Sequence, residues 1–315
     1  MYRPSEKILI KEKNKSIRLK VTDKCPWNCS FCHKEGGWGI DDIQWNCITE
    51  SAFRSLKEKI GITEVHYTGG EPTANKHLES LSAGLVSMGL TVKTTSNGQF
   101  SEKRLKRLIE SGLQSYNFSV ISLDPEEFRR TQEKMSLQCA QSFIAKQREI
   151  ILQAKEISAC VKINTVISAE KDIPRALNVF KFAKENKIVI RFLNDLGKGN
   201  EAIKVIRKIV EETLKSHKVK EKITIGSSAK TSYYKDKDGF DFAIKEIRKN
   251  KLKSLCKDCR ENCTEQFYGI RLEKKQGRFF VRLCIHRNDP KSYMPLGTFL
   301  ASQQLREINT LCKAA

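Results

Sequence analysis

Three cysteines, Cys25, Cys29 and Cys32, stand in a Cys-x3-Cys-x2-Cys pattern directly after a strand-like run at residues 16–22. Thiolates so close together on one loop can bind an iron–sulfur cluster, whose four-iron form normally has four cysteine ligands. Three ligands would leave one iron open, and an open metal position is typical of catalytic sites because a substrate or cosubstrate can occupy it. The spacing therefore predicts a reactive metal cluster.

Zinc is the main alternative at this loop, because His33 could complete a ligand set with the three cysteines. Structural zinc, however, needs four closed ligands, which usually come as two Cys-x2-Cys pairs. A single loop whose first gap is three residues long is not a usual zinc-finger spacing. The pattern favours iron and sulfur over zinc.

The elements that must position this loop alternate regularly between strand and helix patterns. Apolar segments predict strands at residues 16–22, 63–68, 91–96, 115–121, 159–167 and 187–193. Helical periodicity lies between them at about 49–60, 74–88, 101–111, 137–156 and 173–185. Such units form a parallel sheet with right-handed crossovers, so the sequence predicts an α/β fold, a partial (β/α)6 TIM-like barrel with functional loops at the C-terminal strand ends.

The pattern changes after residue 195, which separates a predicted barrel domain at 1–195 from a C-terminal extension at 196–315. The extension opens with a breaker cluster at 197–200, followed by a predicted lysine-rich helix to about Lys218 and a strand at 222–225. Residues 231–240 are typical of a turn or hairpin loop, and the tail after 296 carries one short helical pattern. A second cysteine group lies in the extension: Cys256, Cys259, Cys263 and Cys284.

The 315 residues carry a formal charge of +21, which calls for an anionic partner or a very soluble surface. Acidic residues are interleaved with the lysines, as in Lys57-Glu58-Lys59, so most of the charge is expected on solvated helix faces. Aromatic residues do not accompany the basic runs, so a nucleic-acid partner is an alternative that the sequence does not favour. No apolar run is long enough to span a membrane, and the charged N-terminus has no apolar signal core, so a cytoplasmic protein is expected.

The second predicted strand ends in Thr68-Gly69-Gly70-Glu71-Pro72. Two glycines allow a close backbone approach to a ligand, and Glu71 is an anionic acceptor for a cationic amino group. With the cysteine loop one βα unit upstream, the chain resembles the radical S-adenosylmethionine (SAM) superfamily. The resemblance implies a 4Fe-4S cluster on the three cysteines, whose open iron binds SAM and whose electron cleaves it to a 5′-deoxyadenosyl radical. It also implies that residues 69–72 bind the SAM amino group.

Within that superfamily the chain is most similar to the GTP cyclase of molybdenum-cofactor biosynthesis. The shared motifs include Ser96-Asn97-Gly98, Asn117 with Ser119, Lys162 with Asn164, and Arg191-Phe192. This resemblance implies SAM contacts and a substrate-facing set on the other side of the barrel. The SAM contacts would be Ser96, Asn97 and Ser119, and the substrate-facing residues would be Arg18, Lys162, Asn164, Arg191 and Arg271.

The chain departs from the cyclase where that family holds its triphosphate. The family has Lys-x-Arg just before Thr-Gly-Gly-Glu-Pro, whereas this chain has Glu64 and His66. A carboxylate facing a triphosphate would be repulsive, and two cationic clamps are missing. The sequence therefore predicts a smaller or differently charged ligand than GTP.

The second cysteine group resembles the auxiliary cluster of the cyclase, with one extra cysteine and extra residues inserted. If all four thiolates ligate, this second 4Fe-4S cluster is closed and serves electron transfer or structure. If three ligate, an open iron can hold substrate, and a zinc site is the remaining alternative. The fold prediction accordingly includes a C-terminal auxiliary iron–sulfur cluster region.

The predicted function is that of a radical SAM enzyme acting on an anionic, nucleotide-like small molecule by hydrogen abstraction, cyclisation or rearrangement. An external electron donor such as flavodoxin or ferredoxin is expected. Three alternatives stay open: an authentic GTP 3′,8-cyclase, a peptide-modifying radical SAM maturase, and an enzyme that binds and modifies tRNA.

Overall fold

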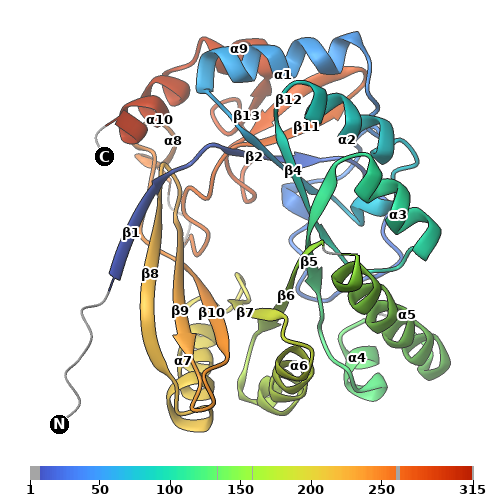
Figure 1. Cartoon of the computed structure of the whole chain (residues 1–315). Coiled ribbons are helices and arrows are strands. Elements are labelled where there is room, and N and C mark those ends of the chain that lie inside the picture. The colour runs from blue at the N-terminus through green and yellow to red at the C-terminus, as the bar shows by residue number, and fades with distance from the viewer. Residues whose placement is uncertain (1–7, 133, 158, 260–262, 314–315) are drawn as a thin grey trace.

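The computed structural model describes residues 8–132, 134–157, 159–259 and 263–313. The strands of these residues form one 13-stranded sheet in the order β1-β8-β9-β10-β7-β6-β5-β4-β3-β2-β11-β12-β13. Figure 1 shows this sheet curled around a central space, with most of the helices on its outer side. The concave inner face therefore belongs to the strands and the loops at their ends.

Six consecutive parallel strands make up the middle of the sheet: β2 (Ser16–Lys20), β3 (Glu64–Thr68), β4 (Thr91–Ser96), β5 (Leu113–Ser119), β6 (Cys160–Ile167) and β7 (Val189–Asn194). The crossover helices are α1 (Cys47–Ile60), α2 (Leu78–Ser87), α3 (Glu102–Glu110), α4 (Pro125–Arg130), α5 (Leu137–Glu156) and α6 (Ile173–Glu185). The predicted α/β fold with a partial (β/α)6 barrel is confirmed.

Strands from the C-terminal stretch extend this sheet at both edges. At one edge β10 (Asp241–Ile247) pairs with β7, followed by β9 (Ala229–Lys235), β8 (His217–Ile225) and β1 (Ile8–Lys13). At the other edge β11 (Arg271–Lys275) pairs with β2, followed by β12 (Arg278–Arg282) and β13 (Tyr293–Pro295). The division at residue 195 stays a prediction, since both stretches share one sheet.

The segment that holds β1 and β2 links the two sides of the curled sheet. Only Asn14 and Lys15 separate the two strands, yet β1 pairs with β8 while β2 pairs with β3. This short connection brings β8–β10 round toward the start of the barrel (Figure 1). The interior is therefore enclosed by more strands than the six of the predicted barrel.

Two predictions for the extension are wrong in detail. The lysine-rich helix is α7 (Asn200–Lys208), which ends in a π-helical turn at Ile209–Thr213, and β8 occupies residues 217–225. Residues 231–235 belong to strand β9, so the predicted turn is confined to about 236–240. Residues 217–225 form a strand because β8 pairs with β1 and β9. The local sequence pattern of these residues does not indicate either partner. The remaining helices are α8 (Lys253–Cys256), α9 (Leu296–Leu300) and α10 (Gln303–Lys313).

The hydrophobic core lies between the sheet and the outer helices. In β3, Val65 and Tyr67 are fully buried in this core, while the alternate residues His66 and Thr68 line the barrel interior. Because side chains alternate between the two faces of a strand, the apolar half of each strand anchors it to the helices. The polar half is thereby held in place to form a site.

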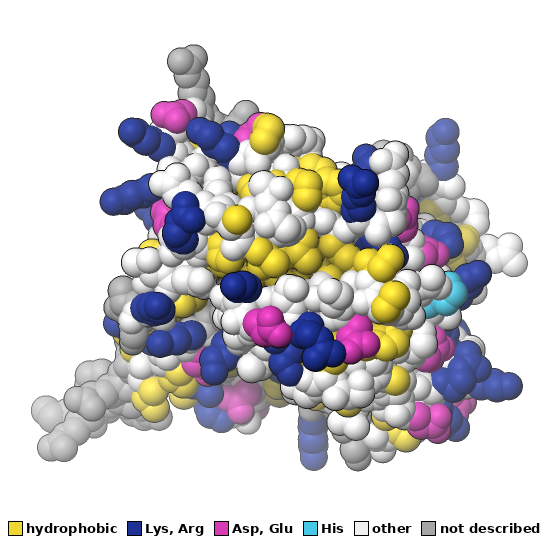
Figure 2. Space-filling view, turned by 90° about the horizontal axis from the view of Figure 1, so that it is seen from above, with side chains coloured by type: hydrophobic (Ala, Val, Ile, Leu, Met, Phe, Trp, Pro, Cys, Tyr) yellow, Lys and Arg dark blue, Asp and Glu magenta, His cyan; other side chains and the backbone are white. Residues whose placement is uncertain are grey.

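Charged side chains are mixed on the face that Figure 2 shows. Lys and Arg are scattered there with Asp and Glu between them, and they do not gather in one basic patch. On this face the excess of positive charge is distributed over the surface, as the interleaved sequence indicates. In the part of the chain that the structure describes, no helix has the length and apolar character needed to cross a membrane.

Candidate active site

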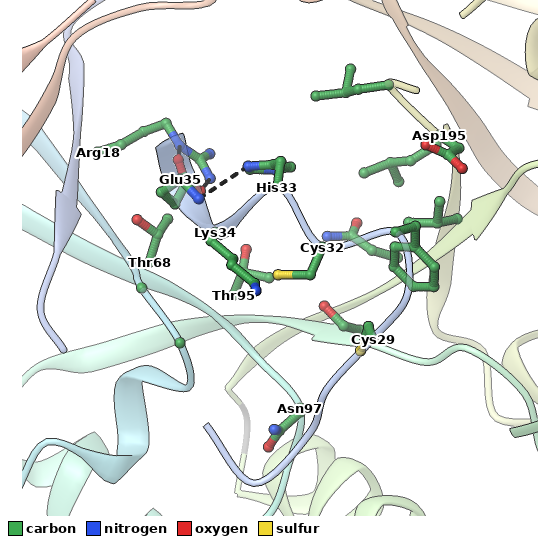
Figure 3. A pocket seen from close by; sticks show the side chains of 18 of the residues that line it. Arg18, Cys29, Cys32, His33, Lys34, Glu35, Thr68, Thr95, Asn97 and Asp195 are labelled. Carbon is green, nitrogen blue, oxygen red and sulfur yellow. Dashed lines mark hydrogen bonds and ion pairs between the residues drawn. The ribbon is translucent and has the colours of Figure 1, made fainter. Parts of the chain in front are cut away.

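A cavity of about 310 Å³ opens inside the barrel, at the C-terminal ends of the parallel strands (Figure 3). Most predicted site residues line this cavity: Arg18, Cys25, Cys29, Cys32, Gly69, Gly70, Glu71, Ser96, Asn97, Ser119, Asn164, Arg191 and Arg271. Two others, Pro72 and Lys162, are not among its lining residues. Lys162 lies two residues before Asn164 on β6, toward the opposite end of the barrel.

The cysteine loop is held by an aromatic anchor and by two amides. Trp27 is buried, and its ring packs edge-on against Phe128 with the ring centroids 4.9 Å apart. The Asn97 side-chain amide donates toward the Cys25 Sγ at 3.9 Å, and the Gln132 Nε2 donates to the Cys29 Sγ at 3.3 Å. Donors directed at sulfur stabilise thiolate and cluster charge. Gln132 was missed in the sequence, where nothing marks it.

Two of the cysteine thiols, those of Cys25 and Cys29, resist deprotonation in the absence of a cation. Burial raises the pKa of Cys25 to about 12, with the Glu71 charge contributing, and burial raises the pKa of Cys29 to about 11. A bound metal reverses this balance, since it stabilises the deprotonated sulfur directly. These cysteines are therefore better suited to bind positively charged iron than to react as free thiolates.

The two glycines after β3 allow the chain to approach the cysteine loop. A Cβ on Gly69 would lie 2.3 Å from the Thr22 carbonyl oxygen, and one on Gly70 would lie 2.3 Å from that of Lys24. The Gly70 N–H donates to Thr22 at 2.8 Å, and the Glu71 N–H donates to Lys24 at 2.7 Å. Both glycines also line the cavity, and their contact with a ligand stays a prediction; the constraint that the structure shows is the close approach of the backbone that leads into the cysteines.

The carboxylate of Glu71 is fully engaged within the protein. It accepts hydrogen bonds from the Thr73 N–H at 3.0 Å, the Thr73 hydroxyl at 2.7 Å, the Ser96 hydroxyl at 2.8 Å and the Asn97 N–H at 2.6 Å. Burial raises its pKa, although these four donors oppose the shift. Glu71 therefore ties the end of β3 to the end of β4, which is a positioning role that the sequence did not reveal.

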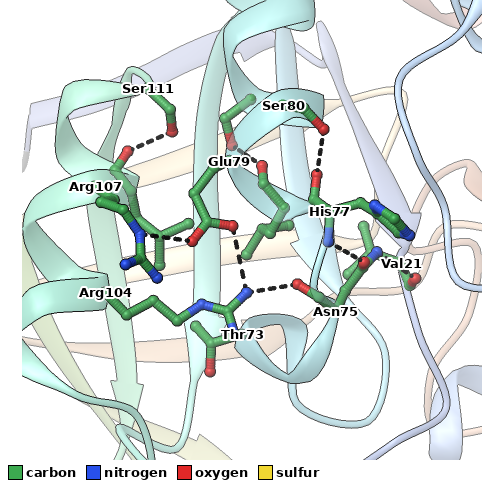
Figure 4. Close-up of polar contacts among 12 residues, drawn as sticks. Val21, Thr73, Asn75, His77, Glu79, Ser80, Arg104, Arg107 and Ser111 are labelled. Carbon is green, nitrogen blue, oxygen red and sulfur yellow. Dashed lines mark hydrogen bonds and ion pairs between the residues drawn. The ribbon is translucent and has the colours of Figure 1, made fainter.

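Asn75, four residues after Glu71, makes a further set of polar contacts, and Figure 4 shows its contact with Arg104. Its side chain is fully buried, and its Nδ2 donates to the Val21 carbonyl at 3.0 Å and to the Ile43 carbonyl at 2.8 Å. The Arg104 guanidinium donates in turn to the Asn75 carbonyl at 2.6 Å. These contacts join both flanks of the cysteine loop to the segment that carries Glu71.

A turn with left-handed backbone follows Cys32. Lys34 and Glu35 have φ values of 52° and 51°, which non-glycine residues adopt only at a cost. The turn places Glu35 in an ion pair with Arg18 and in a second one with Arg271, whose Nε lies 2.7 Å from the carboxylate. Burial by itself raises the pKa of Glu35, but Arg18 and Arg271 outweigh it and hold the pKa well below its usual range.

Arg271 also pairs with Glu265, so it lies between two buried carboxylates. Arg271 lines the cavity, and its predicted role as a substrate contact stays a prediction, with its charge paired to these two carboxylates. Its Nη1 atom is buried and has no hydrogen-bond partner among the described residues. The N–H groups on Nη1 of Arg271 therefore have no acceptor among the described residues.

The opposite wall holds an arginine with neutral partners. The Arg191 Nε donates to the Asn164 side-chain carbonyl at 2.8 Å, and its Nη2 donates to that of Asn117 at 2.5 Å. His66 shares a hydrogen bond of 2.8 Å with the Thr95 hydroxyl, and burial holds its pKa well below the usual range. The histidine that replaces a cyclase clamp is thus a neutral group at neutral pH.

The second cysteine group converges in a separate, much smaller cavity of about 20 Å³. Cys256, Cys259, Cys263 and Cys284 all line it, together with residues that include His286 and Arg287. None of the four lines the barrel cavity. Residues 260–262, inside this group, lie outside the described residues. The structure therefore brings together the four thiols that the sequence grouped, away from the main site.

Comparisons with known proteins agree with this geometry. Residues 19–166 match the model of the radical SAM superfamily. The GTP 3′,8-cyclase of Aquifex aeolicus is 30% identical over 200 residues, which are 59% of this chain and 59% of that protein, so the match spans under two thirds of this relative. The cyclase of Nautilia profundicola is 26% identical over 252 residues, covering 77% of this chain and 75% of the relative.

A solved structure is also similar. The crystal structure of Streptococcus suis SuiB bound to precursor peptide SuiA is 18% identical, with a TM-score of 0.48, and the match covers 64% of this chain and 44% of that one. The cysteine loop, the Glu71 corner and most of the barrel strands all lie within the stretch that matches the family model. Residues 19–166, slightly under half of this chain, are therefore similar to the radical SAM superfamily.

Proposed function

We propose that this protein is a radical SAM enzyme that cleaves SAM reductively and abstracts hydrogen from an anionic, nucleotide-like small molecule. The observation that carries the proposal is the placement of three cysteines and a cationic wall on one enclosed cavity. One wall can hold a redox cluster and the facing wall can hold an anion.

Cys25, Cys29 and Cys32 would hold the 4Fe-4S cluster. When bound, this cluster supplies the electron that cleaves SAM to the 5′-deoxyadenosyl radical.

Ser96, Asn97 and Ser119 would contact SAM, beside the corner that Glu71 holds together. Ser96 and Asn97 are oriented by the Glu71 carboxylate, and Asn97 also reaches toward Cys25. Such preorganised polar groups orient a cosubstrate without moving on binding. Because the Glu71 carboxylate is occupied, an amino group here would meet mainly the backbone carbonyl groups of the loop.

The substrate would lie against Arg18, Asn164 and Arg191, where it would undergo cyclisation or rearrangement. The enclosed barrel limits contact of a radical with water. The position of one cyclase clamp is occupied by neutral His66, and Glu64 is paired with Lys93 instead of lining the cavity. These features support an anion other than a triphosphate held at β3.

The second cysteine group would hold a closed auxiliary 4Fe-4S cluster. All four thiols share a small cavity of their own, which supports four-thiolate ligation without an open iron at the substrate. Such a cluster serves electron transfer or structure, with an external flavodoxin-like or ferredoxin-like donor.

Anaerobic incubation of the reconstituted protein with SAM and dithionite tests the proposal. Wild-type protein should form 5′-deoxyadenosine, and Cys29→Ala should form essentially none. Cys47→Ser, at an exposed cysteine of α1, is the matched control and should retain full activity. Full 5′-deoxyadenosine formation by Cys29→Ala would overturn the assignment.

The similarity to GTP 3′,8-cyclases supports a second candidate, namely that reaction itself. Incubation with GTP, SAM and reductant separates the two. A cyclised nucleotide would identify the cyclase and would contradict the role given to His66. Formation of 5′-deoxyadenosine without any GTP conversion would support a different anionic substrate.

A further inference from the structure

We propose that Lys245, Arg191 and the hydroxyl of Tyr268 form an oxyanion-binding subsite that anchors a phosphate or carboxylate group of the substrate. The inference rests on the proposed function for the identity of the ligand as substrate. It assigns Lys245 and Tyr268, which neither the cysteine motifs nor the cyclase resemblance indicates.

The charges around the cavity are unevenly compensated. Arg18 and Arg271 are both paired with carboxylates, as described above. Among the described residues, neither Arg191 nor Lys245 forms an ion pair with a carboxylate; Arg191 contacts amide oxygens, and Lys245 contacts Tyr268. Three cations that line the cavity thus have no carboxylate partner among the described residues: Lys34 on the turn after the cysteines, and Arg191 and Lys245 on the barrel strands.

Arg191 and Lys245 lie on the same inner face of neighbouring strands. In the parallel pair of β7 and β10, Arg191 is opposite Ala243 and Lys245 is opposite Leu193. Since alternate residues share a face, Lys245 lies one inward position beyond Ala243, toward the C-terminal strand ends.

Tyr268 reaches this pair from the opposite side of the barrel, just before β11. Its ring centroid is 5.0 Å from the Lys245 Nζ and 5.6 Å from the Arg18 guanidinium carbon. Although burial by itself raises the pKa of Tyr268, the charges of Lys245 and Arg18 lower it below the usual range. The phenol is therefore a strong donor beside two cations.

Holding two uncompensated cations inside a barrel is unfavourable unless an anion joins them. Desolvation lowers the pKa of Lys245 and that of Arg191, because burial disfavours the charged form of each side chain. An oxyanion would accept hydrogen bonds from the ammonium, the guanidinium and the phenol together. Charge-assisted hydrogen bonds of this kind are the strongest available to such a ligand.

Calorimetric titration of the anaerobically reconstituted holoenzyme tests this subsite, with inorganic phosphate in one arm and acetate in the other at constant ionic strength. Wild-type protein should bind at least one of the two anions. Tighter binding of phosphate would indicate a phosphorylated substrate, and tighter binding of acetate would indicate a carboxylate substrate. Lys245→Gln should weaken that binding roughly tenfold or more, because it removes a charge-assisted contact. Tyr268→Phe should weaken it about threefold or more, because it removes one hydrogen bond.

Lys237→Gln is the matched control, since Lys237 is exposed in the turn between β9 and β10 and loses the same charge. It should bind like the wild type, and Lys245→Arg should restore most of the affinity that Lys245→Gln loses. The subsite is overturned if neither anion binds wild-type protein, if Lys245→Gln and Tyr268→Phe both bind like the wild type, or if Lys237→Gln loses as much as Lys245→Gln.

SAM cleavage by the wild type, measured on the same preparation, separates this inference from the proposed function. Cleavage of SAM without anion binding would contradict the proposed subsite and would still support the radical SAM assignment. Anion binding that depends on Lys245, without any SAM cleavage, supports the subsite and removes the proposed function.

Discussion

The Glu71 carboxylate accepts the Asn97 backbone N–H at 2.6 Å, and this one contact joins the ends of two strands that carry separate parts of the site. The same carboxylate holds the Ser96 hydroxyl at 2.8 Å. Glu71, which the sequence motif marks as a ligand contact, therefore also holds together the corner at which we propose that SAM binds.

Glu71→Gln should destabilise the protein by about 1–3 kcal/mol, because an amide cannot accept all four donors and leaves one of them buried without a partner. Urea unfolding measures this loss, and SAM binding should weaken in parallel. Glu58→Gln, at an exposed position of α1, should change neither quantity. Unchanged stability of Glu71→Gln would show that the four contacts contribute little.

Asn75→Asp should be more damaging although it changes only one atom. The new carboxylate oxygen would face the Val21 and Ile43 carbonyl oxygens in a fully buried site, where no water can compensate. A loss of at least about 3 kcal/mol is expected in urea unfolding. Asn200→Asp, exposed at the first turn of α7, is the matched control and should be neutral or slightly stabilising. Equal stability of the two variants would contradict the role of Asn75.

Replacing Cys25, Cys29 and Cys32 together by alanine should remove only part of the iron. Anaerobic iron and sulfide analysis should show roughly four irons fewer than in the wild type, with the remainder on the second cysteine group. Further replacement of Cys256 and Cys284 should remove that remainder. A triple variant that holds no iron would argue against an auxiliary cluster.

Asp172 should make stability depend on pH in the acid range. Burial alone raises its pKa, but the Arg175 guanidinium and the Ser168 N–H hold the pKa below its usual value. Since the folded-state pKa is the lower one, the stabilisation is fully present above the unfolded value of about 4 and is lost as the pH falls through the folded pKa. At pH 7 the Asp172→Asn variant should therefore be less stable than the wild type by about 1–3 kcal/mol. This difference in the free energy of unfolding should become smaller in acid. Parallel pH profiles of the two proteins would contradict this.

Gln132→Leu should lower the reduction potential of the first cluster. Its Nε2 donates to the Cys29 sulfur at 3.3 Å, and hydrogen bonds to cluster sulfurs stabilise the reduced, more negative state. A redox titration followed by electron paramagnetic resonance measures the shift. Gln153→Leu, on the outer helix α5, should leave the potential unchanged. An unaltered potential in Gln132→Leu would show that this donor does not influence the cluster.

Much of the barrel could be predicted because each of its elements carries its own pattern. The strand predicted at 91–96 is β4 with the same bounds, and the helix predicted at 137–156 is α5. The helix predicted through Lys218 failed, because the strand character of 217–225 depends on its partners β1 and β9. The hydrophobic periodicity of a segment indicates which of its faces is buried, but it does not indicate which strand pairs with that segment.

The sequence by itself determined that three closely spaced thiols lie one βα unit before a glycine-rich loop, and this spacing predicts an iron–sulfur site. Only the tertiary structure decided which charges remain uncompensated. Glu35 and Arg271 are 236 residues apart in sequence and form an ion pair, and Gln132 reaches a cysteine 103 residues away. Ion pairs and hydrogen bonds act over a few ångströms, so the substrate side of this barrel is set by contacts that no local pattern encodes.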